Sequence, residues 1–316
     1  MPDSSPPVPQ NPLRGIALKV GSVCIFVSMA SLIKATAGAI PPGEAVFFRS
    51  FFAIPVILAW LLLRHDLAHG LETRNPMGHV WRGLVGTSAM GLGFAGLGLL
   101  PFPEVTAIGY AAPILVVIFA AMFLGEQVRL FRLSMVALGM GGVLIVLSPR
   151  LNLDPATADT AQTLGAVVVL MGAVCAALAQ VFVRKLVQTE RTAAIVFWFS
   201  ITASCLSLLT LPWGWAWPTG GQWAMLVGAG LAGGVGQILL TASYRHADAS
   251  LIAPFEYTSM LLAIGVGYFV FAEVPTATML AGAALVVTAG VAIIWRERQL
   301  GLERHRARGA GTPGGH

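Results

Sequence analysis

The sequence predicts an all-α integral membrane protein with ten transmembrane helices, arranged as two inverted five-helix repeats. The first observation is composition. Hydrophobic residues make up 56% of the 316 residues and charged residues only 10%, whereas a typical soluble domain has roughly 25% charged residues. The second is that apolar runs of about 20 residues, enough to cross a bilayer, recur along the chain. The third is that the second half of the chain repeats features of the first.

The apolar runs define the spans, and each is predicted to be helical because a helix satisfies its own backbone in lipid. The predicted spans are 14–36, 44–63, 81–100, 105–124, 131–148, 163–183, 193–211, 222–243, 249–271 and 276–295. Lys19 and Lys34 interrupt the first span, and we expect both side chains to extend toward the membrane surfaces. The Pro-rich residues 1–13 and the basic, Arg- and Gly-rich residues 297–316 are predicted to be disordered tails.

The basic residues orient these spans. If both termini are cytoplasmic, all of the 19 Lys and Arg residues except Lys34, Arg49 and Arg150 fall in cytoplasmic segments. Cytoplasmic segments of membrane proteins carry such an excess of positive charge, and here it includes Arg82 at the start of the third span. The net charge of +5 therefore reflects membrane topology, and no nucleic-acid partner is predicted.

An internal repeat relates the two halves of the chain. Residues 45–52 (AVFFRSFF) align with residues 195–202 (IVFWFSIT), so that Arg49 corresponds to Phe199. The third and eighth spans open alike, with WRGLVG and WAMLVG, and the fourth and ninth both end near a glutamate, in LGEQV at Glu126 and FAEVP.

The repeat divides the chain into two five-span units, residues 15–147 and 163–294. Because five is an odd number, the second unit must be inverted in the membrane relative to the first. Inverted repeats are the architecture of many secondary transporters, whose substrate site lies between the halves near the middle of the membrane. We therefore expect a small-molecule substrate and a surrounding lipid bilayer as the partners of this chain.

The motifs resemble those of the drug/metabolite transporter superfamily, in particular its EamA-type transporters. The resemblance covers residues 15–147 and 163–294 and depends on PPGEAVFFRS at the opening of the second span, LGEQV, FAEVP, and ADASLIAPFEYTSML at residues 247–261. It implies a bacterial inner-membrane transporter of small organic metabolites that works by alternating access and needs no cofactor.

Within that family, the GE-x-VFFRS and APFEYT pairing is similar to the riboflavin importers and also to S-adenosylmethionine carriers. Riboflavin uptake is the function that this resemblance favours. Transport of S-adenosylmethionine, or export of amino acids or other metabolites, is the alternative. The direction of transport and the coupling ion stay open, as does the oligomeric state.

Two charged residues inside the spans are candidate substrate-binding residues, Arg49 and Glu256. A charge at the bilayer centre costs about 2.5 kcal/mol or more, so it normally faces a cavity or a partner. Arg49 could hold a polar or anionic substrate, or simply pair with a carboxylate. Glu256 could bind a proton, balance Arg49 or accept hydrogen bonds from a substrate. It could instead bind backbone amides freed by Pro254, which should leave the helix bent or locally open.

Three further candidates are Tyr110, Tyr257 and Gln237. The two tyrosine rings could stack on a planar substrate, although each could equally pack between helices. The amide of Gln237 needs a partner in the membrane, either another helix or the substrate.

Several other kinds of site are not indicated. The three cysteines and six histidines show no metal-ligand spacing, so neither a metal nor a cofactor is predicted. The GLGFAG sequence at residues 91–96 matches a dinucleotide fingerprint only by its letters, because it lies inside an apolar helix. An intramembrane enzyme is the competing class, but HExxH and GxSxG motifs are absent, so we expect no enzyme. A channel or receptor scaffold would not require an inverted repeat.

Overall fold

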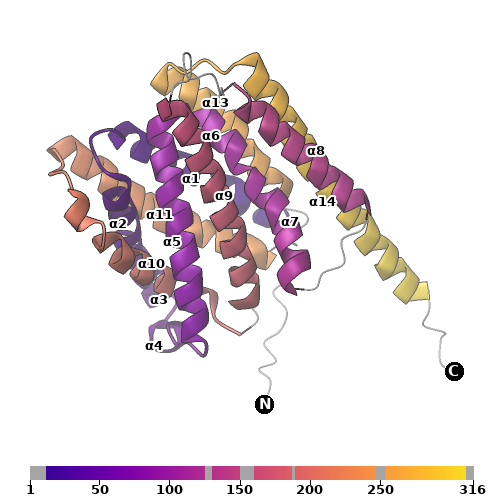
Figure 1. Cartoon of the computed structure of the whole chain (residues 1–316). Coiled ribbons are helices and arrows are strands. Elements are labelled where there is room, and N and C mark those ends of the chain that lie inside the picture. Colours follow the sequence, from indigo (N-terminus) through magenta and orange to yellow (C-terminus); the bar gives the residue numbers. More distant parts are fainter. Residues whose placement is uncertain (1–11, 125–129, 150–159, 187–188, 247–252, 311–316) are drawn as a thin grey trace.

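The computed structural model describes residues 12–124, 130–149, 160–186, 189–246 and 253–310. These parts are helical apart from turns and one isolated bridge between Ala37 and Ile40. Figure 1 shows the helices gathered into a bundle. The α-helices are α1 (Pro12–Thr36), α2 (Pro42–Phe51), α3 (Ala53–Leu63), α4 (Leu67–Gly70), α5 (Pro76–Leu99), α6 (Phe102–Gly109), α7 (Ala111–Leu124), α8 (Leu130–Leu147), α9 (Thr160–Leu186), α10 (Thr192–Leu208), α11 (Gly220–His246), α13 (Thr258–Phe271) and α14 (Ala277–Ala310). Two 3-10 helices are η1 (Leu211–Trp213) and η2 (Ala253–Tyr257).

Helices cover the described part of every predicted span. Within the described residues, six helical segments are long and apolar enough to cross a membrane: Leu13–Thr36, Pro42–Leu63, Phe102–Phe123, Thr160–Val183, Gly220–Leu240 and Ala277–Arg296. Shorter apolar helices cover Leu133–Leu147, Thr192–Leu208 and Phe255–Phe271, and the glycine-rich third span lies on α5. The prediction of an all-helical membrane protein is confirmed.

Proline explains why two of the spans are broken helices. The second span breaks at Phe52, three residues before Pro55, and the fourth breaks at Tyr110, three residues before Pro113. A proline has no N–H for the carbonyl one turn earlier, and its ring crowds that turn, so the helix kinks there. The break in the fourth span presents Tyr110 at the junction of α6 and α7.

The ninth span is also irregular at its start. The residues around Pro254 form the 3-10 helix η2, and the regular helix α13 begins only at Thr258. The bent backbone predicted at Pro254 is thus confirmed, and it places Glu256 in a tighter turn than an α-helix provides. Residues 249–252 of this span lie outside the described residues, as does the predicted turn at Glu126.

The helices pack in pairs. α1 packs along α11, α5 along α9, α2 along α10, and α8 along α14. Figure 1 shows α8 and α14 side by side at one edge of the bundle. They approach closely where Gly142 faces Gly282, because a Cβ atom on either glycine would lie within 2.7 Å of the other's carbonyl oxygen. Small residues allow such backbone contacts between membrane helices.

The predicted tails are shorter than expected. α14 continues from the last span to Ala310, so the prediction of disorder is wrong for residues 297–310. This segment contains four Arg, two Glu and two Leu, which lose little conformational freedom in a helix and so extend the one that precedes them. At the other end, α1 already begins at Pro12, a residue that is favourable at the first helical position. Residues 1–11 lie outside the described part of the chain.

Candidate functional site

Glu256 forms an ion pair with Lys19, the residue expected to extend toward the membrane surface. The Lys19 ammonium contacts the Oε2 atom of Glu256, and the side chain of Lys19 is only 3% exposed while that of Glu256 is 46% exposed. The expectation for Lys19 is wrong because η2 brings a carboxylate to it inside the bundle. A buried ammonium without a carboxylate would be strongly destabilising. Glu256 therefore pairs with Lys19 and not with Arg49.

The two candidate tyrosines lie beside this ion pair and touch each other. Tyr110 and Tyr257 are both buried, and their rings meet edge to face with centroids 5.1 Å apart. The hydroxyl groups of Tyr110 and Ser259 are 2.5 Å apart, which joins α6–α7 to α13. Because the rings pack on one another, helix packing accounts for much of their surface.

Arg49 lies in a separate place, between α2, α10 and α11. The residue is 7% exposed, and its guanidinium carbon is 5.8 Å from the centre of the Phe199 ring. A Cβ atom built on Gly233 of α11 would lie 3.1 Å from the Arg49 Nε atom, so the guanidinium runs close along that helix. In the part of the chain that the structure describes, this Nε has no hydrogen-bond partner.

Arg82 joins Arg49 at the same ring. Its guanidinium carbon is 4.1 Å from the centre of the Phe199 ring, and its buried Nε and Nη1 atoms have no hydrogen-bond partner among the described residues. Arg82, which the charge count places in a cytoplasmic segment, thus turns its side chain inward from the first turns of α5 and toward Phe199. Counting charges by segment cannot detect such a residue, because the count ignores side-chain direction.

Gln237 occupies the face of α11 that carries Gly233. It lies one helical turn beyond Gly233 and is partly buried, and residues four apart share a helix face. Its amide forms no hydrogen bond within the described ranges.

A second ion pair lies at the other end of α1. Lys34 Nζ is 2.8 Å from Glu273 Oε1 and also donates hydrogen bonds to the carbonyl oxygens of Leu97 and Leu100, at 3.1 and 2.9 Å. The other Glu273 oxygen, Oε2, accepts the backbone N–H of Phe102 at 2.7 Å. This network joins α1 and the end of α13 to the end of α5 and the start of α6.

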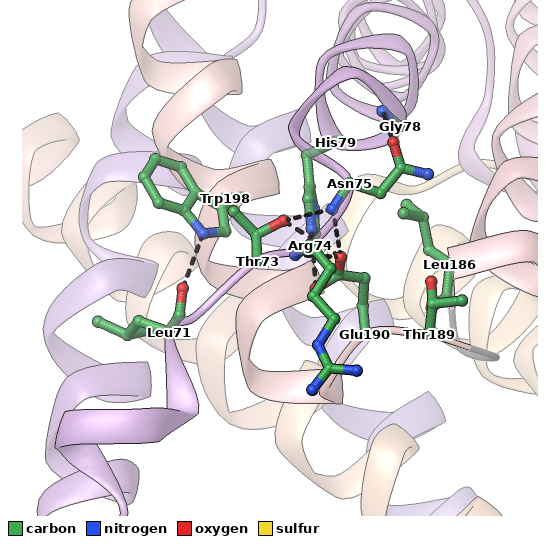
Figure 2. Close-up of polar contacts among 10 residues, drawn as sticks. All are labelled: Leu71, Thr73, Arg74, Asn75, Gly78, His79, Leu186, Thr189, Glu190 and Trp198. Atoms are coloured by element: carbon green, nitrogen blue, oxygen red, sulfur yellow. Dashed lines mark hydrogen bonds and ion pairs between the residues drawn. The ribbon is translucent and has the colours of Figure 1, made fainter.

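Glu190 forms a third polar cluster, outside the spans (Figure 2). Its Oε1 atom accepts the backbone N–H groups of Arg74 and Asn75, both at 2.7 Å, and the hydroxyl of Thr73 at 3.2 Å. Its Oε2 atom lies 3.6 Å from Nε2 of His79. Burial alone would raise the pKa of the Glu190 carboxyl, but the two amides, the hydroxyl and His79 together hold this pKa below its ordinary value.

Each half of the chain matches the same family model. The model of the EamA-like transporter family matches residues 13–148 and again residues 163–296. The chain belongs to this family. It is 30% identical to the pseudopaline exporter of Pseudomonas aeruginosa over 283 residues, which cover 88% of this chain and 95% of that protein.

Two other relatives of this chain are named for different substrates. The S-adenosylmethionine uptake transporter of Rickettsia felis is 26% identical over 84% of this chain and 86% of its own length. The riboflavin transporter of Rhizobium johnstonii is 28% identical over 82% of this chain and 83% of its own length. A solved crystal structure at 20% identity aligns with a TM-score of 0.65 over 90% of this chain and 98% of that one, which shows a shared fold.

These relationships establish a multi-pass inner-membrane transporter and not an enzyme. Within the described ranges, no group of three His, Cys, Asp or Glu side chains could hold a metal ion. The structure brings three of the five predicted site residues together, Glu256 with Tyr110 and Tyr257. Of the other two, Arg49 lies on α2 against Gly233 of α11, and Gln237 lies one turn beyond that glycine. Sequence reasoning missed Lys19 and Arg82, whose partners are remote in the sequence.

Proposed function

We propose that the protein is a secondary transporter that moves a small organic metabolite across the inner membrane by alternating access. In this proposal the chain has ten spans in two inverted five-helix repeats, and both termini are cytoplasmic. Family membership shows that the protein is a transporter, and the proposal adds how it works. The packing of the helices and the Lys19–Glu256 and Lys34–Glu273 ion pairs support this mechanism.

The packing of the helices supports the inverted repeat. If each span is exchanged for its counterpart five spans away, the α1–α11 contact becomes the α9–α5 contact. The contact of α2 with α11 likewise becomes that of α10 with α5. The α2–α10 and α8–α14 contacts are each unchanged by this exchange, because it swaps the two helices of the pair. Such a pattern is expected for two similar halves related by a two-fold axis in the membrane plane.

This pattern also suggests two bodies that could move relative to each other. One, the α1 unit, contains α1, α11, η2 and α13; the other, the α5 unit, contains α5, α6, α7 and α9. Within each unit the helices pack on a central member, α1 or α9. Rocking of such units around a fixed site is the usual form of alternating access.

The Lys34–Glu273 network is the observation that carries the proposal. Lys34 and Glu273 belong to the α1 unit, whereas their partners Leu97, Leu100 and Phe102 belong to the α5 unit. In the proposed topology this network lies at the outer side and closes it. At the inner side, Lys19 and Glu256 both belong to the α1 unit, and Glu256 is 46% exposed. Tyr110 of the α5 unit also contacts Tyr257 and Ser259 of the α1 unit. The two units therefore touch at the outer network and at Tyr110, whereas the Lys19–Glu256 pair lies within one unit and leaves Glu256 exposed, which supports a structure more accessible from within.

A reversible cross-link tests this mechanism. Ala37 follows α1 and Gly98 lies in the last turn of α5, and a Cβ atom on Gly98 would be 3.4 Å from that of Ala37. Disulfides join Cβ atoms roughly 3.5–4.5 Å apart. In a chain whose Cys24, Cys175 and Cys205 are replaced by serine, the Ala37→Cys/Gly98→Cys pair should form a disulfide between the two units.

Solute exchange in proteoliposomes should stop when this disulfide forms and should resume after reduction. Each single-cysteine variant, treated with the same oxidant, serves as the control. Full exchange by the cross-linked protein would show that the outer ends of the two units do not need to separate, and would refute the mechanism.

The proposed cargo is riboflavin or S-adenosylmethionine, in line with two of the relatives. Riboflavin is favoured by the sequence pairing of GE-x-VFFRS with APFEYT. S-adenosylmethionine is favoured by Arg49 and Arg82, because it carries a carboxylate and riboflavin does not. Uptake of each labelled compound into liposomes, with the other as competitor, distinguishes them. Saturable counterflow of one compound identifies the cargo, and absence of counterflow for both removes both from the proposal.

A further inference from the structure

Two arginines, Arg49 buried and Arg82 partly buried, share one aromatic ring inside the helix bundle. The guanidinium carbons of Arg49 and Arg82 lie 5.8 and 4.1 Å from the centre of the Phe199 ring. The three residues come from α2, α5 and α10, which pack against one another. The two positive charges are therefore no farther apart than these two distances together.

Neither arginine has the partners that a buried guanidinium normally has. Arg49 is only 7% exposed, and its Nε atom has no hydrogen-bond partner among the described residues. The buried Nε and Nη1 atoms of Arg82 also have no hydrogen-bond partner there. Among the described residues, neither side chain forms an ion pair with a carboxylate. A guanidinium presents five N–H donors, so several donors here face no protein acceptor.

This arrangement is costly without an anion. Moving a charged side chain out of water costs several kcal/mol even after relaxation, and two like charges close together repel each other as well. A cation–π contact with the ring returns about 0.5–2 kcal/mol for each arginine. Phe199 therefore offsets only part of the cost. A negatively charged group between the arginines would offset the rest.

We propose that Arg49 and Arg82 together bind a carboxylate of the transported solute, with Phe199 holding the two guanidinium groups apart. Only one part of this proposal rests on the proposed transport function, namely that the bound carboxylate belongs to the cargo. A carboxylate fits because its two oxygens can accept paired N–H donors from a planar guanidinium. Gln237, one turn from the glycine that Arg49 contacts, offers an uncommitted amide to the same solute.

The first test measures anion binding without assuming any cargo. Thermal unfolding of the purified full-length protein is followed with increasing succinate, at constant ionic strength set with chloride. The wild-type melting temperature should rise saturably with succinate. In Arg49→Gln and Arg82→Gln this rise should be largely lost.

The same variants give a second, opposite signature. Without succinate, Arg49→Gln and Arg82→Gln should unfold at the wild-type temperature or above it, because each substitution removes an unpaired buried charge. Arg64→Gln is the matched control, since Arg64 also lies over an aromatic ring, 5.0 Å from that of Trp60, but is exposed. It should show the full succinate effect. A lower melting temperature for Arg49→Gln, together with an unchanged succinate effect, would overturn the proposal.

The second test connects the site to cargo. Binding of S-adenosylmethionine and of decarboxylated S-adenosylmethionine, which differ only in the carboxylate, is compared in wild type and Arg49→Gln. Wild type should bind the carboxylated form at least tenfold more tightly, and Arg49→Gln should bind the two forms almost equally. If both proteins bind the two compounds with the same preference, the site does not read the carboxylate.

The two tests also separate this proposal from the proposed function. If succinate stabilises wild type but not the arginine variants, and neither compound undergoes counterflow, the anion site stands while that cargo falls. If counterflow occurs but the arginine variants keep the wild-type preference and succinate effect, the transporter stands while the anion site falls.

Discussion

Replacing Glu190 by alanine should destabilise the protein by about 2–4 kcal/mol at neutral pH, and part of this loss should disappear on acidification. Glu190 precedes α10, and its carboxylate binds the segment that leads into α5. Asn75 caps the start of α5 by accepting the N–H of Gly78 at 2.9 Å. The substitution therefore removes the contact that holds the capping segment of α5 against the second half of the chain.

The magnitude follows from the hydrogen bonds. A hydrogen bond to a charged group contributes about 1.5–3 kcal/mol, and Oε1 of Glu190 accepts two backbone amides at 2.7 Å in addition to the hydroxyl of Thr73. Because Arg74 and Asn75 are exposed, water can replace part of what their amides lose. The two amide bonds alone would sum to about 3–6 kcal/mol, and replacement by water places the expected loss at and below the lower end of that range.

The sign of the pH dependence follows from the lowered pKa of Glu190. A carboxyl whose pKa is lower in the folded protein stabilises the fold above its ordinary value of 4.5, where it is ionised in both states. That stabilisation is lost as the pH falls through the lower, folded value. The gap between wild type and Glu190→Ala should thus be constant near neutral pH and become narrower in acid.

Denaturant titration of the purified protein in detergent measures this gap at a series of pH values. Glu72→Ala is the control, because Glu72 is an exposed acid in the same connecting segment, and it should change the free energy of unfolding little. A gap between wild type and Glu190→Ala that is as large in acid as at neutral pH would refute the assigned role of the charge. So would a loss no larger than that of Glu72→Ala.

Three further predictions concern the remaining polar and packing contacts. Glu256→Gln should impair solute exchange or alter its dependence on pH while membrane expression, followed by immunoblot, stays intact; normal exchange across the pH range would remove Glu256 from the site. Gly290→Ala should lower the free energy of unfolding by about 1–3 kcal/mol, because the added methyl group would overlap the Tyr257 hydroxyl; denaturant titration measures it, and wild-type stability would mean that the ring moves freely. Asp66→Asn breaks an exposed ion pair with Arg191 and should change the stability by less than about 1 kcal/mol; a larger loss in the same titration would show that this pair is better shielded than its exposure indicates.

Much of the fold could be predicted because the residues that indicate each helix lie within the helix itself. Apolar runs gave helices in every predicted span, and Pro254 marked the irregular start of the ninth. The helix of residues 297–310 was missed because a polar, charged composition is shared by disordered tails and by exposed helices. Composition describes what a segment can bury, whereas an existing helix lowers the cost of adding further residues to it.

The polar contacts were less predictable, since they join residues remote in sequence. Nothing near Lys19 indicates that its partner is Glu256, 237 positions later, and both side chains have a plausible alternative at the membrane surface. Arg82 presented the same difficulty, because its position near a span end is typical of a cytoplasmic anchor. Sequence patterns predict where the charges lie along the membrane normal, but pairing requires the arrangement of the helices.

The pair Arg49 and Phe199 shows how the repeat and the site are connected. The sequence aligns these two residues as equivalents in the two halves, and the structure places them in contact. In the proposed two-fold arrangement this follows directly, because α2 and α10 are equivalent helices that pack on each other, so equivalent positions meet near the axis. An arginine in both halves would bring two like charges together there. Phenylalanine in the second half instead gives Arg49 a ring to lie on and leaves room for Arg82 on the same ring. Phe199→Leu should therefore weaken succinate binding without removing either charge, since the guanidinium groups lose the surface that holds them apart; unchanged binding would show that the helices alone position the arginines.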